Sequence, residues 1–580
     1  MNAANHWLPS PKWAFHFGLV VVFVVALIPY ATVESLEFVL WDDNVYVTER
    51  PEIHGGLTSD GIKWAFTTFQ NANWHPLTWL SYMLEIELCG LDPGAMHLTN
   101  LGLHGLNAVL VACLLNSLTG SQGLSLGAGL LFGVHPQHVE AVAWVSERKE
   151  LLCTFFGLQS MLVWQWSRMS GRILHRVLAY LLFVLSLLSK QMLVTLPFLL
   201  VVLAVCPLKS GDHEIQWKRV APAARSVWCY FVLALGFTVT VFAAQRSGDA
   251  IMSIDVLPIR FRLVNAVQSL VLYIAQTFAP INLSPFYRHS MQEISVEFTV
   301  FCGAILLAAG IWVCRNRTHP GTLAGSLWFL GTLVPVLGIV QLGAASRADR
   351  YMYFPHIGLF LLIGTLPVFF QKRRLVMNAC ILVLAVTVCS VLTWRQSRIW
   401  RNNISLWQAC LKVDPDNFRG HDQLALALLA DDQVEEALRE SQIAMRYVEN
   451  RSYGGTYTTL GCAQLFSGDI ENAVRNLREA IRIRPFDYRA LINLGYAVHT
   501  SDLGESKQLF TEALKYAPMN VEALGNLANC EAEEGNFTRA IELLRTAIKI
   551  DPENPQLKEN LRIFQQAQRQ IPSQGSAFGP

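Results

Sequence analysis

The segment GDIENAVRNLREAIRIRP, residues 468–485, decides the fold of the last third of the chain, because its pattern recurs at a nearly constant spacing. A small residue stands at its sixth position, an alanine follows seven residues later, and a proline closes the segment five residues after that. The three columns are Ala437, Ala473, Ser506 and Ala540, then Ala444, Ala480, Ala513 and Ala547, then Glu449, Pro485, Pro518 and Pro552. Three columns in register are not expected by chance, so the sequence contains a repeated structural unit.

This unit resembles the tetratricopeptide repeat, a pair of antiparallel helices about 34 residues long. In such a pair the small residues allow two helices to pack closely, and the proline ends the second helix. Gly461 and Gly495 supply further small positions, whereas Gly468 and Gly535 mark the turns between paired helices. Four repeats fit, preceded by the half-repeat SLWQACLKVDP at 405–415. We therefore expect a tetratricopeptide α-solenoid over residues 401–565 and a flexible tail over 566–580.

The first 400 residues differ from the repeats in composition. The whole chain is 52% hydrophobic and only 15% charged, with a mean hydropathy of +0.32, whereas soluble domains carry about 25% charged residues. Apolar runs follow one another through residues 1–400, and the repeats have the composition of soluble helices. A formal net charge of +1 argues against nucleic acid as a partner, because no basic stripe is present. The predicted fold class is all-α: a polytopic transmembrane domain over residues 1–400, followed by the solenoid.

Twelve apolar stretches are candidate membrane crossings, since a helix needs about 20 apolar residues to span the hydrocarbon. These stretches are 14–33, 97–118, 122–141, 151–167, 176–189, 190–207, 226–245, 263–279, 297–314, 322–342, 353–370 and 375–393. The basic links at 168–176, 209–225 and 372–374 are expected on the cytoplasmic side. They agree with one another if the short stretch 263–279, with its three amide side chains, is re-entrant or lies at the surface. We therefore predict about eleven crossings, with the repeats and the aromatic-rich loop 34–96 on the external side.

Metal-ligand patterns are weak. The twelve cysteines are scattered and form no CxxC pair, which favours buried apolar thiols. His135 and His138 are three residues apart and would allow a metal, but nothing in the sequence completes a ligand set. The sequence predicts no metal site and leaves a divalent metal requirement open.

An acidic pair, Asp42–Asp43, follows the first apolar helix in the external loop. Adjacent carboxylates at a membrane surface could act as a general base or hold a hydroxyl group for attack. The alternative is an ordinary solvated loop, and the residues alone leave both open.

Three basic clusters interrupt apolar sequence at predicted external helix ends. A charge near the bilayer centre costs about 2.5–3.5 kcal/mol on insertion scales, so these groups must reach the interface or line a polar cavity. Singly they could be interfacial anchors, but together with the acidic pair on one membrane face they indicate a site for an anionic lipid headgroup. The clusters are HPQHVEAVAWVSERKELL (135–152) with His135, His138, Glu140, Glu147, Arg148, Lys149 and Glu150; Ser189–Lys190; and SRADRYMYFPHIG (346–358) with Arg347, Asp349, Arg350 and Tyr353.

A polytopic domain with an acidic pair in a long first external loop resembles the GT-C glycosyltransferases. More closely, WDD, HPxHxEAVAW, the SK step, the DRYMYFP run and the trailing repeats resemble the transmembrane and tetratricopeptide repeat-containing O-mannosyltransferases and their bacterial relatives. The resemblance covers nearly the whole chain. It implies transfer of a sugar, usually mannose, from a polyprenyl-phosphate carrier to an acceptor hydroxyl on the lumenal or periplasmic side, with no further cofactor apparent from the sequence.

The same resemblance implies roles for residues of this chain. Asp42 and Asp43 together would remove the proton and position the acceptor. The departing lipid phosphate would be stabilised by cations, for which the candidates are Arg148, Lys149, Lys190, Arg347 and Arg350. His135, His138, Glu140 and Tyr353 complete the set of expected substrate contacts. An acceptor protein would be presented by the repeats.

Other functions remain open at this point. The repeats are fewer than in the animal members and the loop 246–262 is short, so the sugar and the acceptor are undetermined. The alternative function is a non-catalytic membrane-anchored scaffold, although such an anchor needs one or two helices and no charged helix ends. We expect a bacterial inner membrane protein with its repeats in the periplasm, or an endoplasmic reticulum protein if the source is eukaryotic.

Overall fold

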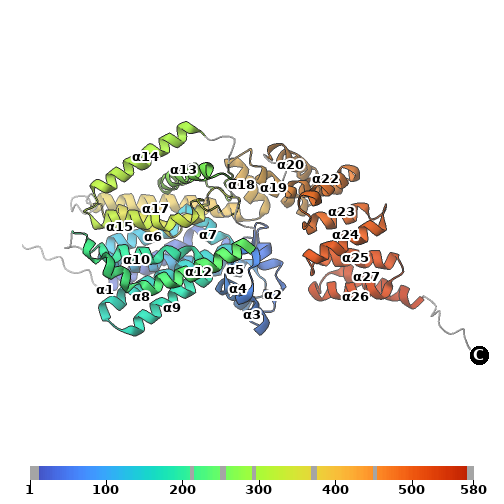
Figure 1. The fold of residues 1–580 in the computed structure, drawn as a ribbon, viewed down its shortest axis with the longest axis horizontal. Helices are drawn as coiled ribbons and strands as arrows, with labels where there is room; N and C mark the ends of the chain where they lie inside the picture. The colour runs from blue at the N-terminus through green and yellow to red at the C-terminus, as the bar shows by residue number, and fades with distance from the viewer. Residues whose placement is uncertain are drawn as a thin grey trace, which may run out of the picture. The chain divides into compact units, whose positions relative to one another are not determined.

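The computed structural model describes residues 12–209, 214–247, 257–289, 295–341, 343–366, 375–448 and 453–570. The chain divides into two compact units, 1–409 and 410–580, so the division falls inside helix α18 (Asn403–Val413) and not at the expected position 400/401. All regular elements of the described residues are helices, and the one β-type pairing among these residues is a single bridge between Tyr287 and Arg347 (Figure 1). The prediction of an all-α chain is confirmed.

The first unit contains the apolar helices. Five segments are long and apolar enough to cross a membrane by length and composition, and five shorter apolar helices accompany them. The long segments are Trp13–Ser35, Pro93–Thr119, Trp228–Arg246, Val296–Arg315 and Val376–Trp400. The shorter ones are Gln122–Val134, Ile173–Ser189, Gln191–Val205, Pro320–Val336 and Pro355–Gly364. Helix α13 (Ile259–Phe278), which covers the weakest predicted crossing, is in neither group, and the count of eleven crossings stays a prediction.

Two breaks in the helices create the region that carries the site. Helix α6 (Gln122–Val134) ends before Pro136, which cannot donate a helical hydrogen bond, and the short elements η5 (Pro136–His138), α7 (Val139–Ala143) and η6 (Val145–Glu147) follow. Helix α8 (Arg148–Ser170) then runs to Gly171, whose φ of +68° ends it in the left-handed conformation. Helix α9 (Ile173–Ser189) returns alongside α8 and ends at Lys190, which is extended.

Residues 34–96 form short helices. They are η2 (Val33–Ser35), η3 (Asn44–Thr48), α2 (Pro51–His54), α3 (Ser59–Thr67), η4 (Gln70–Ala72) and α4 (Pro76–Cys89). Their aromatic side chains build a small core: Trp79 is buried, stacks on Tyr46 at 5.0 Å between ring centroids, and meets the edge of Trp64 at 5.0 Å. This core fixes the segment that carries the acidic pair.

The second unit is the predicted solenoid of four helix pairs. The pairs are α19 (Phe418–Ala430) with α20 (Val434–Tyr447), α21 (Gly454–Phe466) with α22 (Ile470–Ile483), α23 (Tyr488–Val498) with α24 (Leu503–Tyr516), and α25 (Val521–Glu533) with α26 (Phe537–Ile550). All eight residues of the two small-residue columns are completely buried, as close helix packing requires. Gly468 and Gly535 adopt φ values of +85° and +84° at the turns. The register of the repeats is therefore confirmed.

Two predictions concern segments that lie partly or wholly outside the described residues. Helix α27 (Pro555–Gln570) continues past residue 565, and residues 571–580 of the expected tail lie outside the described ranges. The basic link 372–374, used to orient the last apolar helix, also lies outside them.

Candidate active site

Asp43 connects the acidic pair to the turn η6, which precedes helix α8. One carboxylate oxygen accepts hydrogen bonds from the backbone N–H and the hydroxyl of Ser146, at 2.9 and 2.5 Å, and the other accepts the N–H of Val39 at 3.0 Å. The side chain is fully buried. Burial raises the pKa of Asp43 to about 6, against the hydrogen bonds from Ser146 and Val39 that lower it. Both oxygens of Asp43 are thus engaged within the protein.

Asp42 is placed differently from its neighbour. Its side chain is only half-buried, and it acts electrostatically on both Tyr46 and Lys149. Its backbone carbonyl accepts the N–H groups of Val45 at 3.0 Å and Tyr46 at 2.9 Å, which starts the helical turn η3. The acidic pair therefore presents one structural carboxylate and one carboxylate beside a lysine.

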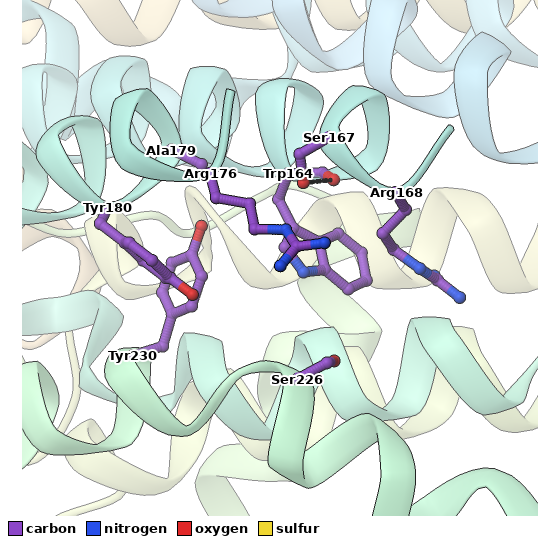
Figure 2. A pocket seen from close by; sticks show the side chains of 8 residues that line it. All are labelled: Trp164, Ser167, Arg168, Arg176, Ala179, Tyr180, Ser226 and Tyr230. Carbon is purple, nitrogen blue, oxygen red and sulfur yellow. Dashed lines mark hydrogen bonds between the residues drawn. The ribbon is translucent and has the colours of Figure 1, made fainter. Parts of the chain in front are cut away.

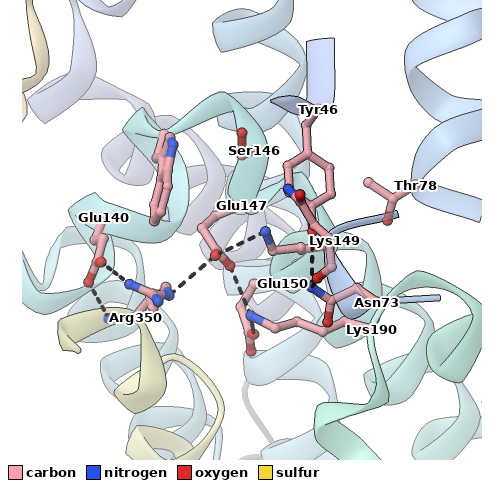
Figure 3. A network of polar contacts seen from close by, with 12 residues as sticks. Tyr46, Asn73, Thr78, Glu140, Ser146, Glu147, Lys149, Glu150, Lys190 and Arg350 are labelled. Atoms are coloured by element: carbon pink, nitrogen blue, oxygen red, sulfur yellow. Dashed lines mark hydrogen bonds and ion pairs between the residues drawn. The ribbon is translucent and has the colours of Figure 1, made fainter. Parts of the chain in front are cut away.

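Glu147 is the centre of a buried ionic network (Figure 3). Its carboxylate lies 2.9 Å from Nζ of Lys190, 3.2 Å from Nε of Arg350 and 3.4 Å from Nζ of Lys149. Burial alone would raise the pKa of Glu147, but these three cations outweigh it and hold that pKa well below its usual range. Glu147 is therefore ionised at neutral pH, and its carboxylate contacts all three cations.

Two further carboxylates complete the network. Lys190 also pairs with Glu150 at 2.8 Å, and Arg350 pairs with Glu140 through both its guanidinium and its backbone N–H. The network thus contains three carboxylates and three cations drawn from three separate parts of the chain. Residues 140–150 supply four of them, the end of α9 supplies Lys190, and helix η10 (Asp349–Met352) supplies Arg350.

Lys149 is the least constrained cation of the three. Its 3.4 Å contact with Glu147 is the longest in the network, and Asp42 is a further carboxylate that acts on it electrostatically. Its ammonium group lies 4.3 Å from the ring centroid of Tyr46 and 5.8 Å from that of Trp144. Burial lowers and Glu147 raises the pKa of Lys149, with a net rise, so the group is fully charged. An ammonium with free donors beside Asp42 is suited to an anionic oxygen.

Trp144 forms a wall of the same region. Its ring stacks on Trp400 at 5.7 Å, lies 6.5 Å from Trp41, and has the Arg350 guanidinium at 5.2 Å. Its indole N–H is buried and has no hydrogen-bond partner among the described residues. Flat aromatic faces beside cations form a surface suited to a sugar phosphate.

Arg148 points away from this network. It lies 2.5 Å from Glu85, and it donates to Oδ1 of Asn100 at 2.9 Å and to the Met96 carbonyl at 3.0 Å. Its side chain is fully buried, so it ties α8 to α4 and α5 (Pro93–Thr119). The structure gives Arg148 a supporting position and leaves its expected phosphate contact untested.

Arg347 lies on a neighbouring aromatic ring. Its guanidinium is 3.7 Å from the ring centroid of Tyr287, and the phenol of Tyr287 donates to Asp349 at 3.0 Å. Burial, then Glu140, raises the pKa of Asp349 to about 8. Arg347 and Asp349 border the network from the side of η10, and within the described residues Arg347 forms no ion pair with Glu147.

The expected contacts His135, His138 and Tyr353 form a separate buried cluster. Nε2 of His138 is 2.8 Å from Nδ1 of His356, and Nε2 of His135 is 3.0 Å from the Thr277 carbonyl. The Tyr353 hydroxyl is 2.8 Å from Nδ1 of His104. These groups bond to one another and to backbone, and the described residues contain no group of three or more side chains placed to hold a metal ion.

The sequence matches known proteins in both units. Two tetratricopeptide-repeat family models match residues 458–505 and 497–562. Protein O-mannosyl-transferase F38B6.6 of Caenorhabditis elegans is 24% identical over 442 residues, 71% of this chain and 60% of its own length. Protein O-mannosyl-transferase TMTC3 of Homo sapiens is 23% identical over 594 residues, 90% of this chain and 63% of its own length. The chain is similar to protein O-mannosyl-transferases over most of its length.

A shorter match has a higher sequence identity. Protein O-mannosyl-transferase TMTC4 of Homo sapiens is 31% identical over 180 residues, which is 27% of this chain and 24% of its own length. The chain spans somewhat less than two thirds of the relatives that it matches over most of its length. The resemblance expected from WDD, HPxHxEAVAW and the repeats is therefore shown at the level of homology.

Some roles in the site were not expected from the sequence. Glu147 and Glu150 belong to the predicted cluster 135–152, yet nothing in the SERKE run assigns them a role or a partner, and Trp144 and Ser146 were not singled out at all. Trp144 precedes the run and Ser146 lies within it. Their partners, Trp400 and Asp43, are about 100 or more residues away in the sequence. One signal was available: a glutamate inside an apolar stretch must have a cationic partner, and Lys190 and Arg350 interrupt two other such stretches.

Proposed function

We propose that the chain is a membrane glycosyltransferase that moves a sugar, mannose or another hexose, from a polyprenyl-phosphate carrier to a serine or threonine hydroxyl of a protein. The names of its relatives support the reaction class. One observation of the site carries the proposal: Asp42 acts electrostatically on Lys149, which belongs to a buried network that gathers three cations. A base next to cations is what sugar transfer from a phosphate needs.

In the chemical step the carboxylate accepts a proton from the acceptor, and the cations stabilise the negative charge of the leaving phosphate. The acceptor hydroxyl oxygen attacks the anomeric carbon, the bond from that carbon to the phosphate oxygen breaks, and its electron pair leaves with the polyprenyl phosphate. The hydroxyl proton passes to the Asp42 carboxylate, which is half-buried and accessible. Asp43 positions Asp42 by holding its loop to Ser146 and Val39.

The leaving phosphate requires charge stabilisation more than protonation, because it is already a stable anion. Lys149 is the group proposed to meet it, since its ammonium has donors not used by Glu147. Arg350 and Lys190 keep their carboxylate partners and hold Glu147 in place. Arg347, on the Tyr287 ring, is the second candidate for a direct phosphate contact.

The proposal also includes the side of the membrane on which transfer takes place and the part of the chain that binds the acceptor protein. The basic links predict that residues 34–96 and the repeats face the external side of the membrane, the periplasm or an endoplasmic reticulum lumen. The tetratricopeptide repeats are proposed to present the acceptor protein, which is consistent with their match to that repeat family. A scaffold without catalysis would need neither the acidic pair nor the cationic network.

A direct transfer assay tests the proposal. Purified chain is mixed with radiolabelled polyprenyl-phosphate mannose and an acceptor protein, and incorporated sugar is measured for the wild type, Asp42→Asn and the matched control Glu34→Gln. Glu34 is exposed in the same loop. Transfer by the wild type and the control, with loss in Asp42→Asn, supports the proposal. If all three proteins are equally active, Asp42 is not the base; if none transfers sugar from polyprenyl-phosphate mannose, glucose or galactose, the scaffold function is favoured.

A further inference from the structure

A cavity of about 160 Å³ lies at the far end of the α8–α9 hairpin from the ionic network (Figure 2). Three parts of the chain line it: the end of α8, the start of α9, and the junction of α11 (Val220–Ser226) with α12 (Trp228–Ser247). Its volume is close to that of an engineered protein cavity of about 150 Å³ that admits benzene. The lining residues are Trp164, Ser167, Arg168, Arg176, Ala179, Tyr180, Ser226 and Tyr230.

Helix geometry places this cavity about one bilayer thickness from the proposed active site. Arg168 follows Lys149 by 19 residues on the continuous helix α8. At about 1.5 Å per residue the two lie roughly 30 Å apart, which equals the hydrocarbon thickness of a typical membrane. If Lys149 lies at the external face, Arg168 lies at the cytoplasmic face, where the basic links are expected.

The rim of the cavity is cationic. Arg168 and Arg176 are both exposed, and neither lies within ion-pair distance of a carboxylate in the described part of the chain. Arg219 is close enough to act on Arg168 electrostatically. Clustered cations without carboxylates favour an anionic ligand, and the planar guanidinium fork matches the oxygens of a phosphate.

The floor of the cavity is aromatic. Tyr230 is buried, donates or accepts at Ser160 over 3.1 Å, and meets the edge of the Tyr180 ring at 4.9 Å (Figure 2). Trp164 is buried on the other side, with the Arg168 guanidinium 4.9 Å from its ring. A cationic rim over an aromatic floor fits a ligand whose phosphate is joined to an apolar body.

We propose that this cavity binds the phosphate headgroup of an anionic lipid in the membrane leaflet opposite the proposed active site. Arg168 and Arg176 would hold the phosphate, and Tyr180, Tyr230 and Trp164 would contact the first carbons of the lipid. Basic pockets between helices on the cytoplasmic side are a known type of lipid headgroup site. The proposal does not depend on sugar transfer, and a soluble phosphate ester is the other source of the same chemistry.

Lipid-dependent thermal unfolding of the full chain in detergent tests this proposal. The probes are phosphatidic acid in mixed micelles, phosphatidylcholine in mixed micelles, and soluble glycerol 3-phosphate. The test variant is Arg168→Gln with Arg176→Gln. The matched control is Arg172→Gln with Arg225→Gln, which removes the same charge at the same end of the hairpin from residues that do not line the cavity.

We expect phosphatidic acid to raise Tm of the wild type and the control, and its apparent affinity to fall by about tenfold or more in the test variant. Glycerol 3-phosphate and phosphatidylcholine should give little shift at equal concentration. Equal phosphatidic acid affinity in all three proteins, or no shift in any, would overturn the proposal. An equal shift from glycerol 3-phosphate would overturn the lipid and assign a soluble phosphate ester.

A photoreactive phosphatidic acid gives a second measurement that needs no variant. Cross-links on the wild-type chain are mapped by mass spectrometry. Adducts within residues 160–180 or 226–231 support the proposal, and adducts confined to other helices contradict it. This result stands even if the double variant fails to fold.

Discussion

Ser146 donates two hydrogen bonds to one oxygen of Asp43, from its backbone N–H at 2.9 Å and from its hydroxyl at 2.5 Å. The other oxygen accepts the N–H of Val39 at 3.0 Å. The adjacent Asp42 is half-buried and acts on Lys149. Two neighbouring carboxylates that the sequence leaves equivalent therefore have separate roles, and substitutions should separate them.

Asp42→Asn should slow sugar transfer strongly without destabilising the protein. General-base catalysis contributes about 10²–10⁴-fold, so we expect a rate loss of that order with an unchanged Tm. Transfer of radiolabelled mannose and thermal unfolding in detergent give the two readings. A large drop in Tm would show that Asp42 is structural, and full activity would remove it from the chemistry.

Asp43→Asn, in contrast to Asp42→Asn, should mainly lower the stability of the protein. An amide offers one acceptor oxygen where both carboxylate oxygens now accept, so its NH₂ group would face the N–H of Val39 or those of Ser146. Leaving a buried donor unsatisfied costs about 1–3 kcal/mol, measurable as a lower Tm or denaturant midpoint. Ser146→Ala, which removes one of the three bonds, should give a smaller loss. If the Asp43→Asn variant is as stable as the wild type, Asp43 does not have the supporting role.

The repeat unit was predictable from the sequence because its determinants are local and periodic. Columns such as Ala473 and Ala480 recur at fixed positions, and each copy packs against its neighbour in the same way, so spacing alone gives the fold. The apolar helices were also predictable as a class. The number of crossings stays a prediction, because breaks at Pro136 and Lys190 divide apolar sequence into pieces too short for a hydropathy rule to count.

The candidate site was only partly predictable. The sequence indicated Lys149, Lys190, Arg350 and Glu140 as members of basic clusters, but it contains nothing that pairs Lys190 with Glu147 across 43 residues or Arg350 with Glu140 across 210. It also grouped Arg148 with Lys149, although neighbours on a helix point about 100° apart and only one of them can face the network. Such pairings depend on tertiary packing, which no local pattern encodes.

Lys149→Gln should weaken use of the lipid donor more than it weakens the fold. Glu147 keeps Lys190 and Arg350 after the change, so its charge stays compensated. Removing one group that stabilises a developing anion costs about 10²–10³-fold in rate, and we expect kcat/KM for the polyprenyl-phosphate sugar to fall by that order. Lys149→Arg should recover part of the activity. Lys190→Gln is the structural comparison, since it strips two carboxylates of a partner and should lower Tm. Equal loss of Tm in both glutamine variants would assign Lys149 a structural role.

Asp422 in helix α19 should make the solenoid less stable as the pH rises from about 4 to 6. Burial raises its pKa to about 6, so the folded state holds the proton more tightly than the unfolded chain does. Its contribution is complete below the unfolded pKa of about 3.9 and is lost as the pH passes through 6, a change of about 2–3 kcal/mol. Asp422→Asn should remove this slope in unfolding measured between pH 4 and 7. The exposed Asp431→Asn should keep it, and an unchanged slope in Asp422→Asn would refute the assignment.

Two glycine-to-alanine changes in the repeats should have opposite effects on stability: one should lower the free energy of unfolding and the other should raise it. A methyl group on Gly461 would lie 2.7 Å from Cγ of Leu477, which is completely buried and has no room to move away. Overpacking of this kind costs about 1–3 kcal/mol, so Gly461→Ala should lower the unfolding midpoint of the second unit. A methyl group on Gly525 would meet Leu557 at an ordinary 3.4 Å, so Gly525→Ala should gain about 0.5–1 kcal/mol from the higher helix propensity of alanine. Both glycines lie within helices, α21 and α25, so the change in backbone entropy is the same and the difference isolates packing. If both variants shift the midpoint in the same direction, the close approach of Gly461 to Leu477 does not limit that position.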